Sequence, residues 1–168
     1  GSFSFATALT DGSSYAVTVS TQPTTPIQQC TVSNGSGTVA GAEVSSVVLT
    51  CVSGVISVSS AALTFVVEQL GDVATPQTIS VTSSGPVSLE VQTVSIGGAQ
   101  ANHFSIVSNT CDNATLANGQ SCAIQIDYAP LTASGSTADL MIPSSDAGGT
   151  SIVELSGRVT HIFADGFE

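Results

Sequence analysis

The sequence predicts an all-β protein that consists of two small antiparallel β-sandwich modules in tandem. Hydrophobic residues make up 42% of the chain and charged residues only 8%. The apolar residues are mostly Val, Ile, Leu and Ala, and Ser and Thr dominate the polar positions, which is a composition typical of sheets. Short alternating or β-branched runs are separated by Gly, Asn, Asp, Ser and Pro, and no stretch holds a helical apolar period. We therefore expect almost no helix.

The first 53 residues are predicted to form a short β-module with one disulfide. Glycine, proline and asparagine turn signals stand at 11–12, 23–26 and 34–35. The apolar and β-branched runs between these turns predict four strands, at 3–7, 15–21, 30–33 and 44–52.

Residues 54–61 are predicted to be a linker between the modules. They are small and polar and carry no strong turn signal. Residues 62–160 then show about seven strands with regular turns between them, which is the pattern of an immunoglobulin-like sandwich. These strands are expected at 63–67, 77–83, 88–96, 103–107, 121–128, 138–142 and 151–159, and residues 161–168 are left as a carboxy-terminal tail.

Four cysteines, Cys30, Cys51, Cys111 and Cys122, allow three pairings. Sequence proximity favours Cys30 with Cys51 and Cys111 with Cys122, each pair within one module. Neither pair has CxxC spacing and the chain has only two histidines, so disulfides in an oxidising compartment are favoured over a zinc site. We therefore expect a secreted protein.

The charge balance limits the partners. Arg158 is the single basic residue against 12 acids, which gives a net charge of −11, and the chain has no lysine. Nucleic acids and anionic membranes both require Lys and Arg, so neither partner is expected. No run approaches the roughly 18 apolar residues that span a bilayer, so no membrane insertion is expected. Lysine on an edge strand usually prevents that edge from pairing with another chain, and this chain has no lysine. The expected partners are therefore the protein itself or other surface proteins, with glycans as the weaker option.

No catalytic, cofactor or metal site is predicted. His103 and His161 are the only imidazoles, and no GxSxG elbow accompanies them. Carboxylate pairs for glycoside hydrolysis could be sought among Glu68, Asp72, Glu90 and Asp127, but there is no tryptophan to form a sugar platform. Calcium is the better alternative, because several acids occupy turns, although isolated turn aspartates more often cap backbone N–H groups. These acids are Asp11, Asp72, Asp112, Asp146 and Asp165.

The second module contains several runs in a fixed order: LTF from Leu63, TPQT from Thr75, ANHFSI from Ala101, LANGQSC from Leu116 and DYAP from Asp127. Over residues 61–160 these runs resemble the bacterial choice-of-anchor D or ASH-like domain, which is similar in fold to PapD-type immunoglobulin-like sandwiches. The resemblance implies a repeat of large secreted proteins that has no catalytic role and whose paired cysteines staple a loop to the next strand.

The first module contains FSFAT from Phe3, DGSSYAVTV from Asp11 and CTVSNGSG from Cys30. These runs are similar to a tandem cell-surface β-repeat of secreted bacterial proteins. In such repeats a strand precedes the Phe-x-Phe run, and here that strand is missing. The final seven residues, IFADGFE, resemble a short carboxy-terminal motif of exported proteins of Gram-negative bacteria, which implies the cell surface of such a bacterium.

Together these features predict a non-enzymatic extracellular structural or adhesive protein. Our sharpest hypothesis is a fibre subunit joined by β-strand donation, in which the unfilled edge beside Phe3 and Phe5 receives a strand from a neighbour. Ile162, Phe163 and Phe167 make the tail the candidate donor, because they are too apolar for a segment surrounded by water. Against strand donation stand a tail that folds back on its own second module and a first strand lost in a truncation. The alternative function is a passive spacer, or a glycan- or protein-binding module of a larger secreted enzyme or adhesin.

Overall fold

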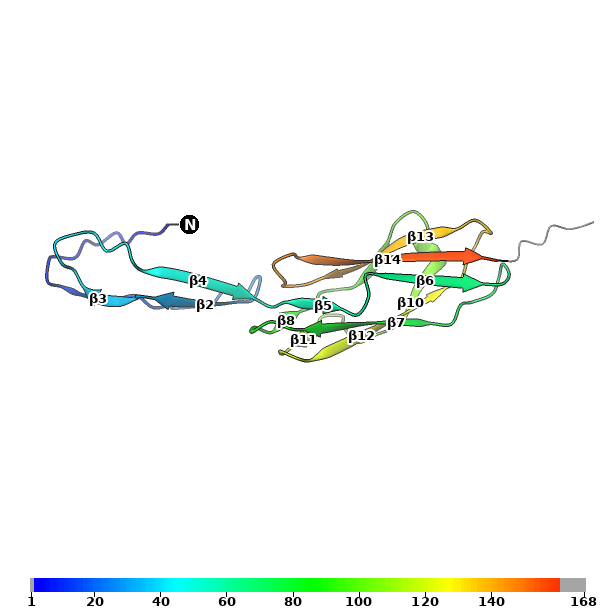
Figure 1. Ribbon diagram of the computed structural model, residues 1–168, viewed down its shortest axis with the longest axis horizontal. Helices are drawn as coiled ribbons and strands as arrows, with labels where there is room; N and C mark the ends of the chain where they lie inside the picture. The colour runs from blue at the N-terminus through cyan, green and yellow to red at the C-terminus, as the bar shows by residue number, and fades with distance from the viewer. Residues whose placement is uncertain (1, 161–168) are drawn as a thin grey trace, which may run out of the picture. The chain divides into compact units, whose positions relative to one another are not determined.

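A computed structural model describes residues 2–160 of the chain (Figure 1). The chain divides between Val52 and Ser53 into two compact units, called unit 1 and unit 2 below. The described residues form strands and turns throughout, apart from one 3-10 turn at Ala101–His103. The predicted all-β class is confirmed, and each unit is described by itself.

Unit 1 consists of two small sheets of two strands each. One sheet pairs β1 (Ser14–Ala16) with β3 (Ser36–Thr38) in an antiparallel register that places Tyr15 opposite Gly37. The other sheet pairs β2 (Gln28–Ser33) with β4 (Val48–Ser53), and the Cys30–Cys51 disulfide joins these two strands.

None of the four strands predicted in unit 1 has the predicted bounds. The run at 30–33 lies inside β2, the run at 44–52 becomes a strand only from Val48, and β3 was not predicted. The other two predictions differ more. The run 3–7 alternates as a strand should, yet it is not one, and residues 2–9 make no hydrogen bond within the part of the chain that is described. The predicted strand 15–21 ends at Ala16, because its partner β3 is only three residues long. Both predictions were wrong for the same reason. A β pattern becomes a strand only where a neighbour offers paired backbone groups.

Unit 1 has almost no core of its own. Among its described residues only Cys30 is buried. Seven large apolar side chains of this unit are more than a third exposed, namely Phe3, Phe5, Leu9, Val44, Val48, Leu49 and Val52. A unit of this size depends on covalent or intermolecular support, because too little apolar surface leaves water on folding.

Unit 2 is a sandwich of two four-stranded sheets. The first sheet has the spatial order β10 (Phe104–Asn109), β12 (Ser121–Tyr128), β7 (Gln77–Ser83) and β5 (Ile56–Val58). The second has the order β6 (Ala62–Val67), β14 (Thr150–Val159), β13 (Ser136–Pro143) and β9 (Ser95–Gly97). Figure 1 shows β6 and β14 side by side in one layer and β7 and β12 in the other. The pairing of β6 with β14 is parallel, and the other ladders of these sheets are antiparallel.

The predicted linker at 54–61 is corrected by the structure, because it contains β5. Ile56 and Val58 are half-buried against the core of unit 2, and Ser57 between them is exposed. β5 pairs with β7 and places Val58 opposite Val81. The backbone N–H of Ile56 also donates to Oδ2 of Asp146 (3.2 Å). This short alternating run therefore completes a sheet instead of separating two modules.

Two more strands of unit 2 have other bounds than predicted. The run 88–96 is divided into β8 (Leu89–Glu90), which pairs with β11 (Thr115–Leu116), and the separate strand β9. Residue 103 belongs to the 3-10 turn, so β10 starts at Phe104. Both changes in strand bounds leave the inward-facing apolar residues in the core. The predicted immunoglobulin-like sandwich is therefore confirmed for this unit.

The core of unit 2 holds 22 buried hydrophobic residues from both sheets. At one end of this core the rings of Phe65, Phe104 and Tyr128 pack with centroid distances of 5.0–6.0 Å. Gly157 of β14 lies against the Tyr128 ring so closely that an added Cβ would overlap it. This contact explains why a glycine stands in the middle of the longest strand.

Candidate functional site

His103 belongs to the packed interior of unit 2. Its Nδ1 lies 2.6 Å from Oγ of Ser136, and the same hydroxyl lies 3.2 Å from the Tyr128 hydroxyl. His103 is 6% exposed and Ser136 is 1% exposed, so a substrate has no access to this serine. The hydrogen bonds among these three side chains satisfy polar groups that would otherwise be costly to bury. His161 lies outside the described residues.

The turn aspartates accept hydrogen bonds from the backbone. Asp11 accepts from Gly41 N (2.6 Å), Asp72 from Gln69 N (3.0 Å), Asp112 from Val94 N (2.8 Å), and Asp146 from Gly148 N (2.7 Å). Over residues 2–160 no group of three His, Cys, Asp or Glu side chains converges as metal ligands would. These carboxylates therefore stabilise turns, and Asp165 lies outside the described residues.

The acids considered for glycoside hydrolysis come from separate elements of unit 2. Glu68 follows β6, Asp72 lies in the next turn, Glu90 is on β8 and Asp127 is on β12. No hydrogen bond joins any two of them in the described part of the chain.

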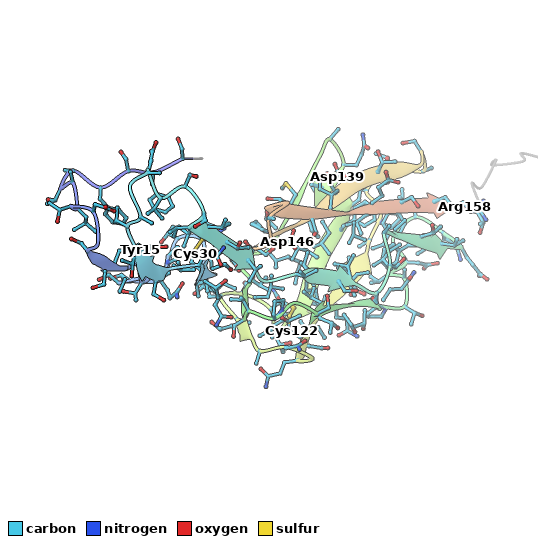
Figure 2. The ribbon with its side chains drawn as sticks, turned by 60° about the vertical axis from the view of Figure 1, so that its left-hand side comes forward. Tyr15, Cys30, Cys122, Asp139, Asp146 and Arg158 are labelled. Atoms are coloured by element: carbon cyan, nitrogen blue, oxygen red, sulfur yellow. A yellow bond between two sulfur atoms is a disulfide. The ribbon has the colours of Figure 1, made fainter. Side chains whose placement is uncertain are left out.

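A depression of about 450 Å³ lies on the outer face of the β6–β14–β13 sheet. Its lining includes Asp139 on β13 and Glu154 on β14, which are directly opposite each other in the ladder. Figure 2 labels Asp139 on this sheet. Both side chains are exposed, and like charges in this position repel each other. Two acids alone do not define a ligand site.

Replacing Asp139 with Asn should stabilise unit 2 slightly. Removal of the cross-strand repulsion is expected to raise the free energy of unfolding by about 0.5 kcal/mol or less at low salt. Because the pair is exposed, the gain should shrink at high ionic strength. Urea denaturation of Asp139→Asn, Glu154→Gln and the double variant measures the coupling, and additive effects of the two substitutions would contradict the predicted repulsion.

A more distinctive feature is an apolar groove of about 330 Å³ in unit 1. Its lining includes Val17, Val19, Val32 and Leu49 together with the Cys30–Cys51 disulfide. Phe3 and Phe5 complete the lining, and their rings meet edge to face with centroids 5.8 Å apart. Figure 2 labels Cys30 in this unit and Cys122 in the other.

Of the five residues predicted for self-assembly, the structure places two. Phe3 and Phe5 line the groove and remain 50% and 68% exposed. Ile162, Phe163 and Phe167 lie outside the described residues. Sequence reasoning missed the four aliphatic lining residues, although the spacing of Val17 and Val19 puts both on one face of an extended segment.

Strand β4 beside the groove is exposed on both faces. Leu49 and Cys51 line the groove, and Val48 and Val52 point to the other face. β4 pairs only with β2, so for residues 48–52 the second edge carries no backbone hydrogen bond in the described structure. An uncharged, β-branched edge of this kind is a template for another strand.

Both disulfides occur in the pairing that sequence proximity favours. Cys30 is bonded to Cys51 and Cys111 to Cys122, and no free cysteine remains. Two disulfides without a free thiol fit a secreted protein. In the described residues there is no helix of the length and hydropathy that a membrane span requires.

No family model and no curated protein matches the chain. Among solved structures, the VesB protease of Vibrio cholerae is 20% identical, with 62% of this chain and 32% of that chain covered and a TM-score of 0.51. A protein of unknown function from Porphyromonas gingivalis W83 is 17% identical, with 80% and 66% covered and a TM-score of 0.51. The ASH/PapD-like domain 7 of human CEP192 is 11% identical, with 64% and 86% covered and a TM-score of 0.49.

These likenesses show a shared β fold and carry no activity over to this chain. The chain spans about a third of the length of the VesB chain. PapD-like and ASH domains are among the similar structures, as the sequence predicted, but with scores below 0.5. The resemblance to the choice-of-anchor D family and the IFADGFE motif stays a prediction.

Proposed function

We propose that the protein is a non-enzymatic, extracellular structural or adhesive protein of a bacterial surface that assembles with copies of itself by β-strand donation. The observation that carries the proposal is the incompleteness of unit 1. Among its described residues it buries only one and exposes seven large apolar side chains, and residues 48–52 of β4 leave their second edge unpaired. A strand from a neighbour covers apolar surface and satisfies edge groups at the same time.

The chemistry of the surface supports self-association. The chain has no lysine and one arginine, so its edges lack the positive charges that usually prevent pairing. The two disulfides support a place outside the cytoplasm, and the IFADGFE run supports the surface of a Gram-negative cell. The absence of catalysis is part of the proposal. It is supported by the burial of His103 and Ser136 in the core.

Light scattering after size-exclusion chromatography, together with electron microscopy, tests this function. Over a wide concentration range we expect oligomers that grow with concentration, and elongated particles at the upper end. A protein that stays monomeric at millimolar concentration and binds a defined polysaccharide would instead be a glycan-binding module. Monomers that bind neither a glycan nor another surface protein would leave the passive spacer.

A further inference from the structure

We infer that the groove of unit 1 is the receptor for the tail, residues 161–168, of a second copy of this chain, with Phe163 and Phe167 inserted beside the β4 edge. The inference rests on the proposed self-assembly and names its two contacting parts. Donation of this kind joins unlike surfaces. Successive copies then extend into a chain, unless the rotation between them closes a ring or two copies exchange tails reciprocally.

The shape of the receptor favours an inserted segment over a flat partner. The groove is concave, with a volume of about 330 Å³, and its aliphatic lining includes Val17, Val32 and Leu49. Phe3 and Phe5 on its margin offer ring edges and faces to an incoming aromatic side chain. Residues 48–52 of β4 lie beside it, and in the described structure their second edge offers backbone groups to an added strand. The site thus presents apolar pockets and a strand edge together, which is the arrangement that strand addition uses.

The tail has the matching chemistry. Ile162, Phe163 and Phe167 place three large apolar residues in eight, and these belong to no described element of either unit. Asp165-Gly166 is a turn dipeptide between the two phenylalanines.

The tail follows directly on the last strand of unit 2. The β6–β14 ladder begins with Ala62 opposite Glu154 and ends with Val67 opposite Val159. Thr160 N still donates to Val67 O (3.0 Å), so the tail starts immediately past the end of this ladder. The chain therefore enters β6 at one end of the ladder and leaves β14 at the other.

Two variants separate the donor from the receptor. A chain that stops at Thr160 has a groove and no tail. Leu49→Asp places a charge in the groove and keeps the tail, and because Leu49 is 48% exposed the substitution should not disturb folding. Leu9→Asp is the matched control, since Leu9 is the same residue type in the same unit, is 51% exposed and does not line the groove. Retention of the melting temperature and of both disulfides confirms that each variant is folded.

Each variant alone should be monomeric, and an equimolar mixture should form a one-to-one complex and nothing longer. The unmodified chain and Leu9→Asp should form extended chains. A fluorescent peptide of residues 160–168 should bind the truncated chain at least tenfold more tightly than a truncated chain that also carries Leu49→Asp. Loss of binding with Phe163→Ser in the peptide, and recovery with Phe163→Leu, would support insertion of an apolar side chain.

The outcomes distinguish this inference from the function on which it rests. If the truncated chain assembles as the full chain does, the tail is not the donor, although self-assembly stands. Disulfide trapping of β4 against a second β4 would likewise reject the tail in favour of edge-to-edge pairing. If the unmodified chain never assembles at any concentration, the proposed function fails and the inference fails with it.

Discussion

Serine at both Cys30 and Cys51 should unfold unit 1 and leave unit 2 folded. The disulfide closes a loop of 21 residues, and in the chain-entropy treatment such a closure contributes about 3 kcal/mol. Unit 1 has no core to compensate for its loss, because Cys30 is its only buried described residue. Amide exchange and limited proteolysis at concentrations where the chain is monomeric should show cleavage and full exchange confined to residues upstream of Ser53.

The second disulfide provides the matched control. Cys111–Cys122 closes a loop of 11 residues, and its loss costs a similar amount, about 3 kcal/mol. Unit 2 has its large two-sheet core, so serine at both positions should lower its melting temperature and still give a folded sandwich. If unit 1 without its disulfide stayed protected from amide exchange and proteolysis, its two small sheets would be stable by themselves, which would contradict this prediction.

The substitution Gly157→Ala should destabilise unit 2 by about 3 kcal/mol or more. The added methyl group would overlap the Tyr128 ring, which is fully buried and packed between Phe65 and Phe104. The ring has no free direction to move, since its hydroxyl contacts Ser136. Overpacking of a rigid core typically costs roughly 1–3 kcal/mol, and it costs more where the neighbouring side chains cannot shift. Thermal and urea unfolding of the isolated variant measures the loss.

Gly135→Ala is the control for this prediction. The nearest atom to a Cβ at Gly135 is the Gly157 carbonyl oxygen at 3.8 Å, which is an ordinary contact. Alanine there should change the unfolding free energy by about 1 kcal/mol or less, in the stabilising direction. Equal losses for the two substitutions would mean that the Tyr128 contact is not what requires a glycine at 157.

The strands of unit 2 could be predicted from the sequence where their own residues alternate between buried and exposed positions. The bounds predicted for 77–83 and 121–128 coincide with β7 and β12, because these central strands alternate between the core and the surface. Ile79, Val81, Ile124 and Ile126 supply that alternation and are fully buried. A residue pattern of period two is sufficient when both neighbours of the strand are present in the same unit.

The remaining features depend on contacts that lie far apart in the sequence. The run that contains β5 was predicted as a linker because its residues are mostly small and polar, and only the pairing with β7 makes Ile56 and Val58 part of a strand. The run at 3–7 is the reverse case. Its residues alternate as in a strand, but no strand pairs with them in the described chain. The groove combines residues from separate segments of unit 1, so no local sequence pattern predicts it.

The parallel pairing of β6 with β14 has a mechanical consequence. Tension that pulls on the start of β6 and on the end of β14 draws these two strands in opposite directions along their common axis. The hydrogen bonds between Ala62–Val67 and the last six residues of β14 then bear the load together in shear, instead of breaking one after another. Unit 2 should therefore resist stretching along this direction far better than peeling across it.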